Sequence, residues 1–474
     1  MRFLFVKRRG FCLNKVYQLC VVQTLERLSF YGLLSLLVIY FSHSAHLNDR
    51  LVYSLFAAFL VLSYMACLLG GVIADCYWGY KKTAVNGLIL IAVGCFFIPL
   101  LGFSHIYLSL ALVGCGIGLY EPNMSSLLGS FFANDQTKST AAYTLLYIAV
   151  NIGSLLGITI CAMLVKYVNY REAFNFIAIA ATSAAIILFL CKNIKNHRST
   201  SGDFLSNLFS YLAITVVISL SSFLLSYRSV LVFLLLVICG VSFFILKSAV
   251  IDADSRKKYF VTIFFIFLFN IIFIMLFMQN KTSLTMFSLR EINRNFMGYT
   301  MPASMIQIFS PIFVIIIGPF MMKFWRYLSD KKIKIPVFNQ YGVALTCAGI
   351  AFLILVVATN YYSGLEPLYV IIFFYLFITL SELIIGPVGL STILHFTKKN
   401  KLSQVMGIWN FTFAIANYLA AKIAMVGSVD LAHLLQYHND LDIYHHEFLI
   451  AAVVGMSVAL ISFLLALVVG YVKT

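Results

Sequence analysis

Charged side chains are scarce in this chain of 474 residues: Asp, Glu, Lys and Arg together make up only 11% of it, and only 17 residues are acidic. Hydrophobic residues make up 62%, and the mean hydropathy is +0.97. Soluble globular domains contain about 25% charged residues, so this composition excludes a soluble fold. The sequence therefore predicts a protein that lies mainly in lipid.

Motifs of enzymes and of metal sites are also missing. The chain contains no phosphate-binding G-x-x-x-x-G-K-S/T loop, no H-E-x-x-H pair and no recognisable Ser-His-Asp arrangement. Its ten cysteines are scattered, with no C-x-x-C pair, and most lie in apolar runs, where we interpret them as small apolar side chains. We therefore predict that the protein is not an enzyme and binds neither a cofactor nor a metal.

A histidine-rich stretch near the C-terminus is the strongest candidate for a metal or pH-sensing site. His433, His438, His445 and His446 lie in a segment that we place in an extracellular loop, among several aspartates. Their spacing is irregular and favours a solvated loop over a metal site. We assign these histidines no role.

Apolar runs long enough to cross about 30 Å of hydrocarbon recur along the whole chain. Six precede a polar stretch at 192–203, two follow it, and six more complete the chain, which predicts about fourteen membrane-spanning helices. The predicted spans are 17–42, 51–74, 84–103, 106–128, 140–166, 172–191, 204–227, 229–250, 259–287, 301–325, 335–358, 367–397, 403–427 and 447–471.

The net charge of +16 comes from basic residues that lie in short clusters between these runs. A nucleic-acid-binding protein would instead gather them on one surface, and we expect no nucleic-acid partner. Alternate loops differ strongly in Lys and Arg content, which is the bias of cytoplasmic loops. Both termini and the loop at 192–203 are therefore predicted to be cytoplasmic. The predicted domains are an N-terminal tail (1–16), a six-helix bundle (17–191), a linker with an inserted transmembrane hairpin (192–258) and a second six-helix bundle (259–474).

The first predicted span carries two adjacent charges, Glu26 and Arg27, within the sequence QTLERLSFYG. Helical spacing places Gln23, Glu26, Arg27, Phe30 and Tyr31 on one face. Charges far from the ends of a span are costly and generally functional, although a structural ion pair between helices would also explain them. We therefore treat Glu26 and Arg27 as candidate functional residues.

Further motifs extend this pattern along the chain: GGVIADCYWGYKKT (70–83), GLYEPNMSSLLG (118–129), LYIAVNIGSLLG (146–157), PASMIQIFSPIF (302–313), SELIIGPVGLS (381–391) and MGIWNFTFAIANYLA (406–420). Their content and order resemble the proton-dependent oligopeptide transporter family of the major facilitator superfamily, and the inserted hairpin resembles its bacterial members. The resemblance implies an all-α polytopic membrane protein with two six-helix bundles that transports di- and tripeptides by alternating access.

The resemblance also implies a set of substrate-binding residues. Arg27 would hold the carboxylate of the peptide, and Glu382 would receive its amino terminus. Aromatic walls and polar groups would complete the binding site. The implied substrate-binding residues are Arg27, Phe30, Tyr31, Tyr64, Glu121, Asn151, Ser310 and Glu382.

The chain departs from the family pattern at charged positions. Gln23 replaces the first glutamate of the E-x-x-E-R motif, and Glu121 stands where the family usually has a lysine. Leu34 and Met278 replace both members of another ion pair, so that contact is expected to be apolar. These departures put the family's usual route of proton coupling in question.

Two like charges, Glu121 and Glu382, would share one cavity if the family's pairing were kept. One carboxyl group would then hold a proton, or Lys281 would offset the charge of Glu121. The alternative for Lys281 is that its side chain extends to the extracellular interface. The implied coupling residues are Glu26, Arg27, Glu121, Lys281 and Glu382.

The sequence thus predicts a transporter of short peptides in the inner membrane, functional as a monomer, with protons as its coupling ion. A first alternative keeps the fold but carries a cationic amino acid, an amine or another small solute, attracted by Glu121 and Glu382. A second alternative is a sensor or scaffold with a transporter fold that does not transport. The chain shows no soluble signalling domain in support of that alternative.

Overall fold

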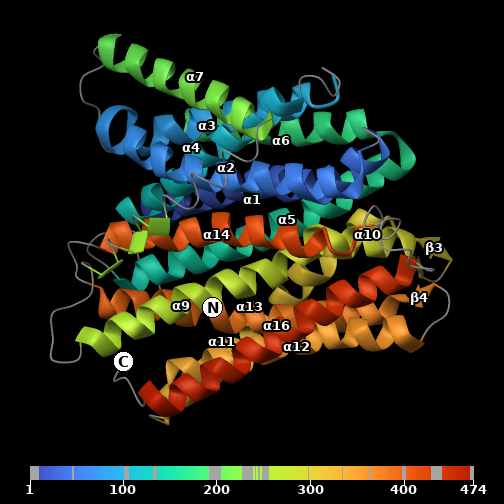
Figure 1. Ribbon diagram of the computed structural model, residues 1–474. Coiled ribbons are helices and arrows are strands. Elements are labelled where there is room, and N and C mark those ends of the chain that lie inside the picture. Colours follow the sequence, from blue (N-terminus) through green and yellow to red (C-terminus); the bar gives the residue numbers. More distant parts are fainter. Residues whose placement is uncertain are drawn as a thin grey trace. The chain divides into compact units, whose positions relative to one another are not determined.

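The computed structural model describes residues 10–44, 47–100, 106–131, 136–191, 204–226, 239–240, 242–243, 246–247, 256–296, 298–331, 333, 335–361, 365–397, 402–428 and 440–469. Nearly all of them lie in helices (Figure 1). The chain forms two compact units. The first consists of Met1–Leu37 and Leu62–Arg228, and the second of Val38–Val61 and Ser229–Thr474.

The first unit is built from long apolar helices around α3. Helix α3 packs most extensively against α4 and α6, and α7 lies against α4 (Figure 1). The helices are α1 (Gly10–His43), α2 (Asp49–Ile73), α3 (Gly79–Phe97), α4 (Ile106–Ser130), α5 (Gln136–Tyr167), α6 (Tyr170–Leu190) and α7 (Phe204–Ser226); the outer end of α1 and the beginning of α2 belong to the second unit.

The second unit has its core among α9, α12, α13 and α16, where α12 packs closely against both α13 and α16. Gly349 and Gly455 let α12 and α16 approach each other, since a side-chain carbon on either would meet the other helix at about 3 Å or less. The helices are α9 (Arg256–Phe277), α10 (Ser283–Arg290), α11 (Phe309–Asp330), α12 (Val337–Tyr361), α13 (Leu368–Phe396), α14 (Leu402–Ala424) and α16 (Asp440–Val469).

The described residues include four two-residue strands, which belong to the second unit. Strand β1 (Ile292–Asn293) pairs in parallel with β4 (Glu366–Pro367), and β2 (Asn295–Phe296) pairs with β3 (Tyr299–Thr300) in antiparallel fashion. The polar segments between spans thus contain local pairing that hydropathy alone does not predict.

Ten helices among the described residues are long and apolar enough to cross a membrane. Thirteen of the fourteen predicted spans coincide with helices; the predicted span at 229–250 lies largely outside the described residues. Several boundaries were wrong; for example, α11 begins at Phe309 rather than at 301. The predicted span 259–287 is interrupted by a 3₁₀ turn at Met278–Lys281, and α16 begins at Asp440, so His445 and His446 lie in a helix rather than a loop. His433 and His438 lie outside the described residues.

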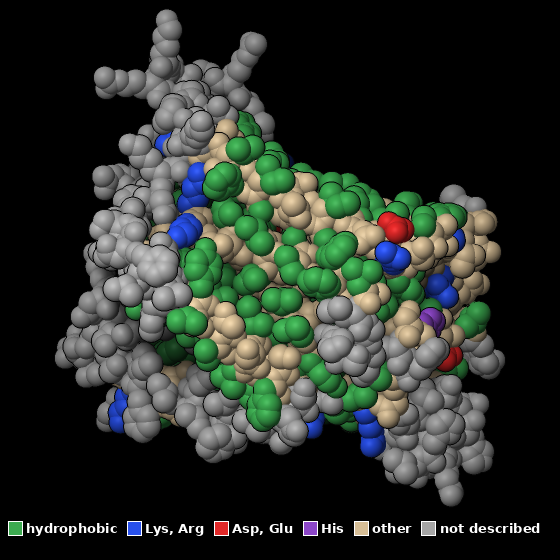
Figure 2. All heavy atoms as spheres, turned by 90° about the horizontal axis from the view of Figure 1, so that it is seen from above, with side chains coloured by type: hydrophobic (Ala, Val, Ile, Leu, Met, Phe, Trp, Pro, Cys, Tyr) green, Lys and Arg blue, Asp and Glu red, His purple; other side chains and the backbone are tan. Residues whose placement is uncertain are grey.

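Hydrophobic side chains cover most of the visible described surface in Figure 2, and the few charged ones lie mostly toward its two ends. Large apolar residues such as Phe189, Leu467 and Val468 are strongly exposed. Apolar surface of this extent is stable in contact with lipid rather than water. The surface therefore agrees with a polytopic membrane protein.

The motif at 70–83 forms a compact connection between α2 and α3. The chain continues from α2 through a π-helical turn, Ala74–Trp78, and reverses at Gly79, whose φ of 73° suits a residue without a side chain. The Nζ atom of Lys81 then donates to the carbonyl oxygens of Phe189 (3.2 Å) and Cys191 (2.9 Å), which caps the end of α6.

Candidate substrate and charge sites

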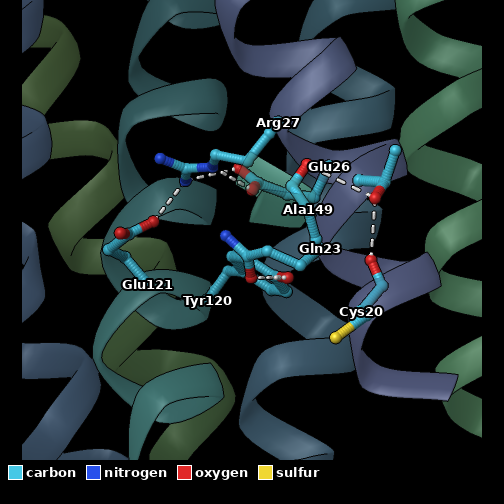
Figure 3. Close-up of polar contacts among 8 residues, drawn as sticks. Cys20, Gln23, Glu26, Arg27, Tyr120, Glu121 and Ala149 are labelled. Carbon is cyan, nitrogen blue, oxygen red and sulfur yellow. Dashed lines mark hydrogen bonds and ion pairs between the residues drawn. The ribbon is translucent and has the colours of Figure 1, made fainter. Parts of the chain in front are cut away.

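Close packing between α1 and α5 positions the charges of the first unit. Side-chain carbons at Gly153 and Gly157 of α5 would overlap the backbone of α1 beside Arg27 and Leu28. Glycine at these two positions lets the helices approach closely. The middle of α1 is thereby fixed against α5, and the Arg27 side chain points toward α4 (Figure 3).

Arg27 and Glu26 form a bidentate ion pair in the middle of α1. Arg27 Nε donates to Glu26 Oε2 at 2.5 Å, and Arg27 Nη2 donates to Glu26 Oε1 at 2.8 Å (Figure 3). The Glu26 side chain is fully buried, and that of Arg27 is 8% exposed. Glu26 thus neutralises the guanidinium and occupies one of its edges.

Glu121 of α4 provides a second carboxylate for Arg27, accepting a hydrogen bond from Nη2. Its side chain is 40% exposed, whereas that of Glu26 is buried. The hydrogen bonds among the described residues leave Arg27 Nη1 without an acceptor. The guanidinium therefore has one edge held by a buried carboxylate and another shared with an accessible carboxylate.

Three aromatic residues surround this group. The Phe30 ring lies 4.7 Å from the guanidinium carbon of Arg27, and the Tyr31 ring lies 5.9 Å from it. Phe30 and Tyr31 meet edge to face at 5.3 Å. Tyr64 of α2 interacts electrostatically with both Tyr31 and Glu121. These rings give the Arg27 site an apolar wall with polar edges.

Polar side chains complete the first unit's cluster. Tyr120 donates its hydroxyl hydrogen to Gln23 Oε1 at 2.8 Å (Figure 3). Gln23 therefore serves as a buried acceptor at the position where the family has a glutamate. Asn151 of α5 donates to its own helix at the carbonyl of Tyr147 (2.9 Å).

The second unit contains a separate polar cluster around Lys281. Lys281, only 6% exposed, donates from Nζ to Gln307 Oε1 at 2.7 Å, and its charge interacts with that of Glu382 on α13. The burial of Lys281 excludes the alternative in which its side chain extends to the interface. Ser310 lies at the start of α11 and is buried.

Glu121 and Glu382 thus each have a cation within their own unit, Arg27 and Lys281 respectively. These cations offset the repulsion from which a shared proton was predicted. The shared proton remains a prediction.

A further ion pair was not predicted from the sequence. Arg290 at the end of α10 binds Asp49 at the start of α2 through two bonds of 2.7 and 2.9 Å, and it donates to the hydroxyl of Tyr444 at 3.0 Å. Asp49 is 5% exposed. The two charges are 241 residues apart, and the only sequence signal was the presence of Arg290 among the few basic residues of the predicted outer side.

The chain resembles known proteins over most of its length. The model of the POT family matches residues 81–438, which is about three quarters of the chain. The chain belongs to the POT family. A dipeptide and tripeptide permease A of Yersinia pestis is 24% identical over 460 residues, covering 95% of this chain and 91% of the permease.

Solved structures of the POT family have the same fold. A peptide transporter POT in complex with sulfate superposes with a TM-score of 0.83 at 20% identity, covering 96% of this chain and 94% of the other. Tetrameric PepTSo2 superposes with a TM-score of 0.82 at 21% identity, covering 96% and 98%. The POT family consists of transporters, so the predictions of family and of a transporter rather than an enzyme are confirmed.

Proposed function

We propose that this POT-family protein is a secondary transporter of di- and tripeptides that works by alternating access. The observation that carries the proposal is the Arg27 guanidinium, buried between aromatic rings, with Nη1 left without an acceptor among the described residues. A group of this kind binds a carboxylate through two parallel hydrogen bonds. Every unmodified peptide carries that carboxylate, whatever its side chains.

The geometry supports an exchange of carboxylates at Arg27. Glu26 holds the Nε side of the guanidinium, so an incoming carboxylate must use Nη1 and Nη2. Glu121 occupies Nη2 and is accessible. We infer that the peptide carboxylate displaces Glu121 from Arg27 while Glu26 keeps the guanidinium in place.

The other end of the peptide needs an acceptor for its ammonium group. Glu382 fits this role because its Oε2 atom is buried without a hydrogen-bond partner among the described residues. Lys281 balances its charge while the site is empty. Phe30, Tyr31, Tyr64, Asn151 and Ser310 complete the proposed substrate set as walls and hydrogen-bonding groups.

Proton coupling is part of the proposal. The proposed coupling set consists of Glu26, Arg27, Glu121, Lys281 and Glu382. Each carboxylate in this set interacts with a cation, and protonation of the carboxylate would break that interaction. A cationic amino acid or amine remains the second candidate cargo, because Glu121 and Glu382 would attract it. That cargo would need no carboxylate at Arg27.

Peptide binding to purified protein separates these cargoes. We expect a neutral dipeptide to bind, and its C-terminal amide, which lacks the carboxylate, to bind at least tenfold more weakly. Arg27→Lys should remove most of this difference, because a lysine cannot form the paired hydrogen bonds. Equal binding of dipeptide and amide to the wild type would exclude the carboxylate role of Arg27.

The proposed architecture is the major facilitator plan: two six-helix bundles and an inserted hairpin, about fourteen helices in the inner membrane, with the domain limits stated above. The clusters of Lys and Arg support cytoplasmic termini and a cytoplasmic 192–203 loop. A cysteine placed at Ser199 should resist a membrane-impermeant reagent in intact cells, and labelling there would reverse the topology.

The proposed functional form is a monomer, because each proposed binding group comes from this single chain. One related structure is tetrameric. Transport by protein reconstituted at less than one chain per vesicle should therefore persist, and its loss at that dilution would show that the oligomer is required.

A further inference from the structure

Glu447 is a buried carboxyl group that the proposed mechanism does not use. It lies in α16, within a membrane-spanning segment, and its exposed fraction is 0%. Its carboxyl group packs against Gly427, where a side-chain carbon would overlap Oε2. Two other buried acidic side chains of the described spans, Glu26 and Asp49, form ion pairs with Arg27 and Arg290. Glu447 has no such cation among the described residues.

One polar neighbour of Glu447 has its hydrogen committed elsewhere. This neighbour is Ser283, at the start of α10. Ser283 Oγ donates to Gln279 Oε1 at 3.0 Å. The orientation of the Gln279 amide is fixed, because its Nε2 atom faces the carbonyl oxygens of Ala420 (3.0 Å) and Met275 (3.3 Å).

Ser283 has no hydrogen left to donate to Glu447. A serine hydroxyl has one hydrogen and two lone pairs. Since the hydrogen of Ser283 goes to Gln279, only the lone pairs remain for Glu447. Ser283 therefore has no hydrogen with which to stabilise an ionised Glu447, and both carboxyl oxygens of Glu447 are buried without a hydrogen-bond partner among the described residues.

The surrounding charges also favour a protonated Glu447. Arg290, which bonds to the neighbouring Tyr444, is paired with Asp49 through two hydrogen bonds. Tyr53 and Tyr444 are uncharged phenols near Glu447 and offer no positive charge. An ionised Glu447 would therefore be a buried charge without a counter-ion, which is strongly unfavourable.

The other titratable groups on the helices that pack against this site are occupied or distant. His445 Nδ1 lies 2.9 Å from Thr359 Oγ1 of α12, and His446 and Asp442 are exposed on α16. Lys422 of α14 is also exposed and lies over the ring of Tyr418. None of these described groups supplies a charge to the Glu447 carboxyl.

We propose that Glu447 is a proton-binding site of the second unit, holding a proton in the state seen here and releasing it during transport. The release step rests on the proposed function, since it makes Glu447 one carrier of the coupling proton. On release, the O–H bond of the carboxyl group breaks, the electron pair stays on the carboxylate, and the proton passes to water or another base.

Infrared difference spectroscopy on purified protein tests the protonation without any substrate. Subtracting the Glu447→Gln spectrum from the wild-type spectrum should leave the C=O band of a protonated carboxyl group, which shifts in D₂O. Ser283→Ala should keep the band, because Ser283 makes no hydrogen bond to Glu447. Glu172→Gln, which changes an exposed carboxylate of α6, should leave the band region unchanged. Absence of a Glu447-dependent band in folded protein would overturn the proposal.

Transport tests the release step. In proteoliposomes, Glu447→Gln should exchange labelled for unlabelled dipeptide as the wild type does but lose accumulation driven by a pH gradient. Normal gradient-driven accumulation by this variant would overturn the coupling role and leave a permanently protonated acid. If the wild type neither binds nor exchanges dipeptides, the proposed function fails, while the infrared result still reports on the proton.

Discussion

Replacing Glu121 by glutamine tests the exchange of carboxylates at Arg27. The substitution removes the negative charge beside Nη2 and keeps nearly the same side-chain shape. The bidentate pair of Arg27 with Glu26 remains, so the guanidinium should stay in place. A peptide carboxylate then no longer competes with Glu121, and we expect dipeptides to bind more tightly.

The size of the effect follows from the exposure of Glu121. With 40% of its side chain exposed, its ion pair is largely screened by water and is worth about 0.2–1 kcal/mol. Removing the competitor should therefore lower the dissociation constant of a dipeptide by about 1.5- to 5-fold. By contrast, Arg27→Lys loses a charged hydrogen bond worth about 1.5–3 kcal/mol and should weaken binding by at least tenfold.

Calorimetric titration of purified protein with a dipeptide and with its C-terminal amide measures both effects. The increase in affinity caused by Glu121→Gln should occur only for the dipeptide and should disappear when Glu121→Gln is combined with Arg27→Lys. If Glu121→Gln instead weakens dipeptide binding as strongly as Arg27→Lys does, Glu121 contacts the substrate directly and the competition is wrong.

Three further predictions concern stability, each measured by unfolding the purified protein. Burial and the neighbouring Glu291 raise the pKa of Glu366, which lies outside the spans, to about 8. The folded state then binds more protons than the unfolded state, so the stability of the fold should decrease as pH rises from about 4.5 to 8. Glu366→Gln should reduce this pH dependence. Arg290→Leu should destabilise by about 3–5 kcal/mol because it strands the buried Asp49, and a cost below 1 kcal/mol would show the pair to be solvated. Gly70→Ala should destabilise because its side-chain carbon would overlap Gly118, whereas Gly71→Ala, with open space around it, should be neutral; equal losses would refute the close packing of α2 on α4.

The sequence was sufficient to predict most helices, because apolar runs of membrane length are governed by the solvent alone. It was also sufficient to predict the charged face of α1, since Glu26 and Arg27 lie in a motif with helical spacing. The break at Met278–Lys281 carries no glycine or proline, and it was missed because hydropathy does not report backbone geometry.

The partners of individual charges could not be predicted from the sequence. Arg27 had two possible carboxylates from different helices, and only packing between α1 and α4 places Glu121 beside it. The ion pair of Asp49 with Arg290 joins two segments far apart in the sequence, and hydropathy does not indicate which helices are neighbours. The burial of Glu447 was not predicted, because the predicted span began at this residue whereas α16 begins seven residues earlier.

Uptake of a labelled dipeptide into proteoliposomes, with and without an inward proton gradient, tests the central claim most directly. The proposed mechanism predicts uptake by the wild type that the gradient increases above equilibration, that an excess of unlabelled dipeptide abolishes, and that Arg27→Lys strongly reduces. Absence of dipeptide uptake by folded wild-type protein under both conditions would contradict it.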